Sequence, residues 1–196
     1  ALYPGFKERI FGVALDIGST TLAAHLCELA SGESLAAAGA MNPQIRFGED
    51  LMSRISYAMT NPDGRKAMTR AVREAADALI GRVAEEAGVA RGDLVELVAV
   101  GNPAMHHLFL GLDPTELGRA PFAPAIDEAL DIAAHDLDLD VAPGAAVHLP
   151  PLIAGHVGAD ASAVLLAEAP HLSDEITLIV DVGTNAEIIL GNRSRL

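Results

Sequence analysis

The chain has 196 residues with 51% hydrophobic side chains, and its 27 acidic and 13 basic residues give a formal net charge of −14. The hydrophobic content excludes a disordered chain, the negative charge argues against nucleic acid or an anionic membrane as a partner, and no apolar run is long enough to span a membrane. Cys27 is the single cysteine, so the chain can form no internal disulfide and cannot by itself hold a cysteine-ligated iron–sulfur cluster, which fits a cytoplasmic protein.

The first half of the chain predicts three strands followed by two helices. Alternating and apolar patterns at 10–17, 20–29 and 34–40 favour an antiparallel meander. A helix is expected from about 50 to 59, and a longer one from about 65 to 87 carries a regular apolar stripe. A turn that contains proline and glycine separates the two helices.

The second half is expected to alternate strands with helices and to end in a hairpin. After a buried strand at 94–100, Asn102 and Pro103 are typical of the start of a helix. The stretch 111–145, rich in Pro and Asp, shows no regular pattern. The remaining expected elements are a short strand, a helix of small residues and the two strands of the hairpin, at 147–149, 155–169, 176–182 and 186–190.

This order of elements predicts an α/β fold of the ribonuclease-H-like type, in which an antiparallel meander feeds a parallel part of one mixed sheet. We expect a tail at 1–9, a first lobe at 10–170 and, at 171–196, the first hairpin of a second lobe whose remainder needs about 100 or more further residues. The hairpin has unpaired strand edges, so we expect it either to pair with a second copy, giving a homodimer, or to pack against its own lobe.

One short pattern occurs near both ends of the chain. An apolar strand runs into Asp16-Ile17-Gly18-Ser19-Thr20-Thr21, and another runs into Asp181-Val182-Gly183-Thr184-Asn185. A carboxylate at the mouth of a buried strand is costly without a partner, and glycine lets the backbone turn close to a ligand. The hydroxyl, amide and backbone N–H groups that follow suit phosphate oxygens. Either copy by itself fits an ordinary turn, but two copies that face each other predict an ATP cleft.

Both motifs resemble the phosphate motifs of the superfamily of acetate kinase, sugar kinases, Hsp70 and actin. Several further blocks narrow the resemblance, and together they look like the C-terminal ATPase region of the ATP-dependent reductive activators of corrinoid proteins. The resemblance covers nearly the whole chain. The blocks are Asn42-Pro43-Gln44, Phe47 to Ile55, Gly101-Asn102 with Met105 to Leu108, Ala120-Pro121-Phe122, and Pro151 to Asp160.

The resemblance implies a function in corrinoid chemistry. Such activators use ATP to drive one electron onto an inactive cobalamin, from Co(II) to Co(I), in the corrinoid protein of a methyltransferase system. A typical member carries a [2Fe–2S] domain before this region, and the single cysteine here places that cluster outside the present chain. A small-molecule kinase of the same superfamily and a non-catalytic module that docks a corrinoid protein remain as alternatives.

The site residues follow from the two motifs. Asp16 is expected to hold Mg²⁺, directly or through water, because hard cations take carboxylate oxygens; capping of the turn is the alternative role. Asp181 is expected to position the attacking water or a second metal contact, so Asp16 and Asp181 are the catalytic candidates. The ATP-binding candidates are the remaining motif residues Gly18, Ser19, Thr20, Thr21, Gly183, Thr184 and Asn185.

Other polar residues favour structural roles. His106 and His107 are adjacent, and on a helix they point about 100° apart, so they bind one metal poorly and a structural or partner-facing role is preferred. Glu49, Asp50 and Arg54 are expected to form a network of surface charges of little energetic weight.

The helix expected at 155–169 begins with a set of small residues. Gly155, Gly158 and Ala159 would share one helical face and allow close packing at the junction of the lobes, where a hinge would lie. Asp160 either caps this helix or faces the cleft, and the pattern favours capping.

Overall fold

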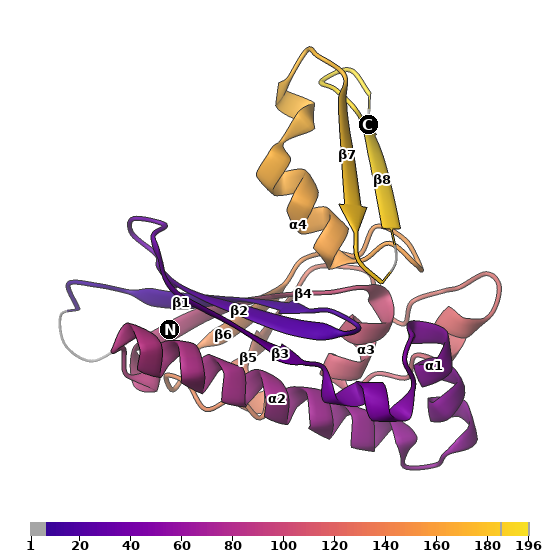
Figure 1. The fold of residues 1–196 in the computed structure, drawn as a ribbon, viewed down its shortest axis with the longest axis horizontal. Coiled ribbons are helices and arrows are strands. Elements are labelled where there is room, and N and C mark those ends of the chain that lie inside the picture. The colour runs from indigo at the N-terminus through magenta and orange to yellow at the C-terminus, as the bar shows by residue number, and fades with distance from the viewer. Residues whose placement is uncertain (1–6, 185, 196) are drawn as a thin grey trace.

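The computed structural model describes residues 7–184 and 186–195, and a mixed six-stranded sheet forms its larger part (Figure 1). The strands lie in the order β3-β2-β1-β4-β6-β5. Their bounds are Phe11–Ile17 (β1), Thr21–Glu28 (β2), Ser34–Met41 (β3), Leu94–Val100 (β4), Leu130–Ala133 (β5) and Ala146–Leu149 (β6).

The pairing confirms an α/β fold with an antiparallel meander and a parallel part. β1, β2 and β3 pair antiparallel, whereas β4 is parallel to both β1 and β6. β1 and β4 are parallel neighbours, with Asp16 opposite Val100, so the segments that follow both strands leave the sheet at the same edge. The stretch 111–145, in which no element was predicted, contributes β5 as an antiparallel edge strand. The strand was missed because four residues are too few to show a period.

Helices cover one face of the sheet. The long α2 (Gly64–Ala87) packs across β2 and β3, while α1 (Leu51–Thr60) and α3 (Pro103–Leu110) lie beside its N-terminal end (Figure 1). The apolar stripe of α2 is fully buried, from Met68 to Val83. Short 3-10 turns lie at Pro43–Phe47, Arg91–Asp93, Thr115–Gly118, Ala134–Leu137 and Pro170–Leu172.

The last third of the chain builds an arm that stands away from the other face of the sheet (Figure 1). It consists of α4 (Ala159–Glu168) and a separate antiparallel pair, β7 (Thr177–Val182) and β8 (Ala186–Gly191). In the described residues these two strands pair only with each other. Their apolar side chains are largely exposed, for example Val182 at 75% and Ile188 at 72%.

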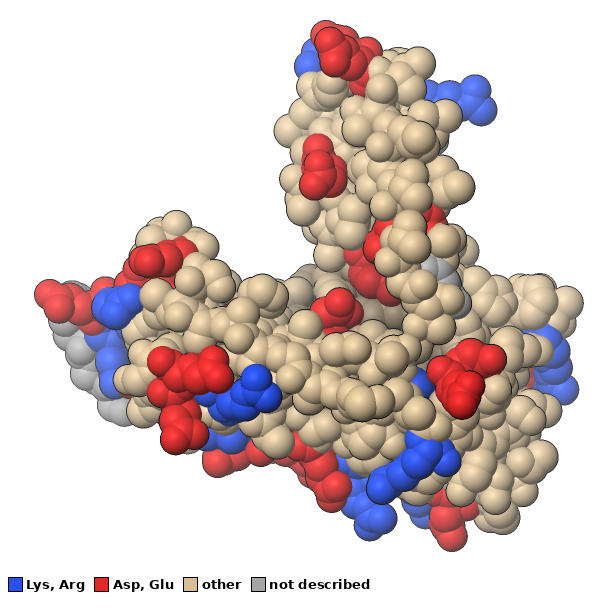
Figure 2. Space-filling view, in the orientation of Figure 1, with Lys and Arg blue, Asp and Glu red and all other residues tan. Residues whose placement is uncertain are grey.

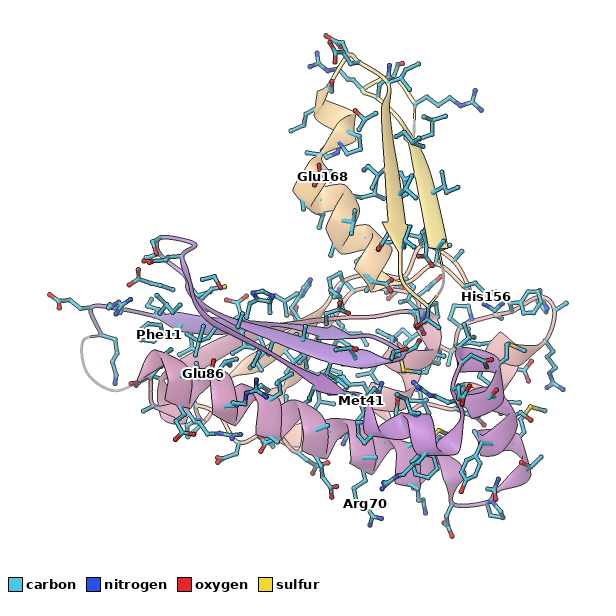
Figure 3. All side chains as sticks on the ribbon, in the orientation of Figure 1. Phe11, Met41, Arg70, Glu86, His156 and Glu168 are labelled. Atoms are coloured by element: carbon cyan, nitrogen blue, oxygen red, sulfur yellow. The ribbon has the colours of Figure 1, made fainter. Side chains whose placement is uncertain are left out.

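The start of α4 differs from the prediction. Gly155 and Gly158 lie in the preceding loop and not on a helical face, and α4 begins only at Ala159. Both glycines are nevertheless sites of close packing, since a Cβ at Gly158 would lie 2.5 Å from the Cα of Asn102 and one at Gly155 would meet the carbonyl of Phe122. His156 (Figure 3) also holds the loop in place: its ring packs edge-on against the ring of Phe122, with 4.7 Å between the two ring centroids.

No helix of the described chain is both long and apolar enough to cross a membrane.

Candidate functional site

A cleft of about 300 Å³ lies where the arm meets the sheet. Figure 2 shows acidic side chains gathered at this junction. The ends of β1 and β4, the start of α4 and the tip of the β7–β8 hairpin enclose the cleft, which is lined by Asp16, Gly18, Ser19, Thr20, Thr21, Asn102, Asp160, Asp181, Gly183, Thr184 and Glu187.

The structure brings the two sequence motifs together across this cleft. Every catalytic or ATP-binding candidate of the two motifs lines it except Asn185, which lies outside the described residues. The motifs touch directly, because the Oγ1 atoms of Thr20 and Thr184 form a hydrogen bond of 2.9 Å between positions 164 residues apart. The motifs thus face each other, and the roles assigned to their residues stay predictions.

The cleft is more acidic than the two motifs alone indicated. Asp160 and Glu187 join Asp16 and Asp181 in its lining. Asp160 lines the cleft at the first turn of α4, where its Oδ1 accepts the N–H of Ala161, and the N-cap of the helix is Gly158 and not Asp160. Glu187 could have been found from the predicted hairpin, in which it stands directly opposite Asp181. Like charges in opposite positions destabilise a hairpin unless a positive charge compensates them.

The pKa values of these carboxyl groups are raised, mainly by burial and in smaller part by their crowding. Partial removal from water, with smaller contributions from Asp160 and Asp181, raises the pKa of Asp16 to about 6. Loss of hydration also raises the pKa of Asp160. The pKa of Glu187 is raised by loss of hydration and, to a smaller extent, by repulsion from Asp160 and Asp181. Repulsion of this kind is the signature of a site that lacks a compensating positive charge.

The donor set fits a hydrated divalent cation. No Lys or Arg is present among the described residues that line the cleft, so the protein itself leaves the carboxylates unneutralised. Within the described chain no three His, Cys, Asp or Glu side chains come together as direct ligands of one ion. Mg²⁺ does not need such a cage, because it keeps several waters and is commonly held by one or two carboxylates plus the phosphates of a substrate.

Hydrogen bonding within the protein uses the Ser19 hydroxyl as an acceptor. Its side chain is buried and accepts a hydrogen bond of 2.9 Å from Nδ2 of Asn102. The orientation of that amide is fixed, because its Oδ1 accepts the N–H groups of Ala104 and Met105 at the start of α3. The Ser19 oxygen is therefore an acceptor toward Asn102, which leaves the hydroxyl hydrogen for an anion in the cleft.

The two adjacent histidines are structural. Both are buried in α3, so the alternative of a partner-facing role is wrong. Nδ1 of His107 lies 2.7 Å from the carbonyl oxygen of Pro103, and its Nε2 accepts the N–H of Ala125 at 2.9 Å, so the ring is neutral with the proton on Nδ1. Burial, with a smaller contribution from His107, lowers the pKa of His106 to about 4.

The expected network of surface charges does not exist. Arg54 is completely buried, whereas Asp50 is exposed and caps α1 by accepting the N–H of Ser53 at 2.7 Å. Glu49 is also exposed. The prediction was wrong because the pattern of charges in a sequence does not show that the fold supplies buried acceptors for this guanidinium, here the carbonyls of Gly48 and Ser19 and the side chains of Gln44 and Met105.

Known proteins match this chain along most of its length. The family model described as the RACo middle region matches residues 11–173. The corrinoid activation enzyme RamQ of Eubacterium limosum is 38% identical over 187 residues, which are 95% of this chain and 31% of that protein. A reductase from Methanosarcina barkeri, named for a methylated amine-specific corrinoid protein in the Co(II) state, is 24% identical over 192 residues, 92% of this chain and 34% of its own length.

A solved structure agrees with these sequences. The reductive activator for a corrinoid, iron–sulfur protein superposes with a TM-score of 0.93 at 37% identity, covering 97% of this chain and 30% of the activator. The chain thus spans about a third of the length of these relatives. The chain belongs to the RACo middle-region family.

Proposed function

We propose that this chain is the ATP-binding region of a reductive activator that serves a corrinoid protein of a methyltransferase system. The observation that carries the proposal is the meeting of the two Asp-x-Gly motifs in one cleft, with Thr20 bonded to Thr184. The relatives support it, because their names describe corrinoid activation, reductive activation or corrinoid protein reduction.

In this proposal different residues of the cleft bind different parts of Mg·ATP. The Ser19 hydroxyl and the backbone of the turn at Gly18 donate to the terminal phosphates from the sheet side, and Thr184 donates from the arm side. Asp181, with Asp160 beside it, orients the attacking water. Asp16, Asp160 and Asp181 would hold Mg²⁺, mainly through its waters, and the ion would neutralise the charge of the phosphates.

The overall reaction has two coupled parts. ATP and water would give ADP and phosphate, and a [2Fe–2S] cluster in another part of the activator would supply the one electron that reduces Co(II) to Co(I). The nucleotide bridges the sheet and the arm, so hydrolysis would change the angle between them and with it the affinity for the corrinoid protein. Residues 10–170 form the first lobe in this view, and 171–196 begin the second. The proposal includes a cytoplasmic location, which the single cysteine supports.

The test is phosphate release from Mg·ATP by an activator that contains this chain, with and without its corrinoid protein. We expect release to increase with the corrinoid protein and to fall by about 10²-fold or more in Asp16→Asn and in Asp181→Asn. The exposed Asp63, which makes no capping hydrogen bond, gives the control Asp63→Asn.

Other outcomes would replace the proposal. Transfer of phosphate to a sugar or a small acid would establish a kinase. The optical spectrum of the corrinoid reports the formation of Co(I). If Co(I) forms at an unchanged rate without ATP, this region only docks the partner.

A further inference from the structure

Arg54 is a buried cation that forms no ion pair within the described part of the chain. It lies in α1 with 0% of its surface exposed. Its guanidinium instead donates to the carbonyl oxygen of Ser19, to that of Gly48 at 3.0 Å and to Oε1 of Gln44 at 3.4 Å. Burying a charge in this way is costly unless every donor is used, so the arrangement calls for a reason.

Asn42 binds the same turn from the same side. Its Nδ2 donates to the carbonyl oxygen of Gly18 at 2.8 Å, and its backbone N–H donates to that of Thr20 at 2.8 Å. The side chain cannot rotate to another role, because its Oδ1 accepts the N–H of Gln44 at 2.9 Å. Asn42 and Arg54 together bind three consecutive carbonyls of the turn between β1 and β2.

These bonds decide where the amides of the turn point. In a trans peptide the N–H is opposite to the C=O, so the N–H of Ser19 is turned away from Asn42 and the N–H of Thr20 is turned away from Arg54. Neither N–H donates to a backbone group of the described residues. Gly18, Ser19 and Thr20 all line the cleft, so the two donors are directed toward the space in which an anion would lie.

We propose that Asn42 and Arg54 are positioning residues for phosphate binding: they hold the carbonyls of the Gly18–Thr20 turn away from the cleft, so that two N–H donors and the Ser19 hydroxyl face the polyphosphate. The Arg54 guanidinium also places a positive charge behind this turn, outside the acidic lining of the cleft. The proposal deepens the proposed function and rests on it, and it assigns the buried residues of the 42–55 segment to ligand binding, beyond their packing.

Arg73 provides a matched control for the Arg54 variants, because its role is purely structural. Arg73 of α2 is also mostly buried and donates to backbone carbonyls, those of Phe109 at 2.8 Å and Asp136 at 3.3 Å. It also forms an ion pair with Asp138 at 2.9 Å, and none of these partners belongs to the Gly18–Thr20 turn. Arg73→Met should therefore lower the melting temperature without changing nucleotide affinity. Arg70, on the outer side of α2 in Figure 3, gives a surface control in Arg70→Met.

The experiment compares Arg54→Lys, Arg54→Met and Asn42→Leu with these controls in the activator that contains this chain. The melting temperature, the Kd for Mg·ATP by calorimetry and the Kd for adenosine are measured for each. We expect about tenfold or greater weakening of Mg·ATP binding in both Arg54 variants and in Asn42→Leu, with adenosine binding unchanged. Arg54→Lys should keep more affinity than Arg54→Met, because it keeps the charge.

A second measurement separates this proposal from the proposed function. Amide resonances of 18–21 in the 196-residue chain are compared between the wild type, Arg54→Lys and Arg73→Met, without nucleotide. Resonance shifts confined to this turn in Arg54→Lys would support the positioning role even if the wild type bound no ATP. Lack of ATP binding by the wild type would refute only the proposed function. Unchanged turn amides, or Arg54 variants that lose stability but keep Mg·ATP affinity, would overturn the positioning role.

Discussion

The raised pKa of Asp16 predicts that this carboxylate destabilises the empty protein at neutral pH. The pKa rises from 3.8 to about 6 on folding. At 1.36 kcal/mol per unit this difference corresponds to about 3 kcal/mol. The side chain still reaches solvent at the mouth of the cleft, so we reduce the expected effect to about 1–2 kcal/mol. Asp16→Asn should therefore increase the free energy of unfolding by this amount at pH 8.

Proton linkage gives the sign and the pH range of the effect. Between the two pKa values the folded protein binds more protons at Asp16 than the unfolded chain does. The stability that Asp16 contributes therefore falls as the pH rises from about 4 to about 6, and it stays at the lower level above that range. The advantage of Asp16→Asn should be full at pH 8 and should nearly vanish at about pH 3, where the wild-type carboxyl group is mostly neutral in both states.

The assay is urea unfolding of the wild type, Asp16→Asn and the control Asp63→Asn at several pH values, in chelator and in millimolar Mg²⁺. Only differences between variants are compared, because other carboxylates titrate in the same range. Mg²⁺ should stabilise the wild type more than Asp16→Asn, since it binds the folded state through this carboxylate. A variant that is no more stable than the wild type at pH 8, or whose advantage does not depend on pH, would refute the reasoning.

The remaining predictions concern packing and assembly. Gly158→Ala should lower the free energy of unfolding by about 2–3 kcal/mol in chemical denaturation, because its Cβ would lie 2.5 Å from the Cα of Asn102; a neutral effect would show that the loop moves freely. His107→Leu should cost about 2–4 kcal/mol, because it leaves the Pro103 carbonyl and the Ala125 N–H without a buried partner, and stability equal to the wild type would contradict this. The exposed apolar strands of the arm should make the isolated chain dimerise, so a monomeric mass in light scattering at high concentration would count against that pairing.

Much of the fold was predictable because its signals are local. Asn102 followed by Pro103 marks the start of α3, and the structure shows the side chain of Asn102 capping that helix. The apolar stripe of α2 and the meander appear as periods in the sequence, and the strand predicted at 94–100 agrees with β4. The two Asp-x-Gly motifs also stand out locally, since strand, carboxylate and glycine follow one another directly.

The tertiary structure decided what depends on segments far apart in the chain. α4 starts at Ala159 because the glycines before it pack against the backbone at Phe122 and Asn102, which the helical spacing of small residues could not reveal. Asp160 became part of the cleft because the arm brings the start of α4 against the turn that follows β4, where the N–H of Ala159 donates to the Gly101 carbonyl at 3.0 Å.

The composition and local order of the sequence determined by themselves the class of fold and both motifs that line the cleft. Only the tertiary structure decided that Arg54 lies inside and holds the turn of the first motif. From a sequence, a charged side chain is expected at the surface, because burial costs hydration energy. Only the folded chain supplies the carbonyls of Ser19 and Gly48 that replace that hydration.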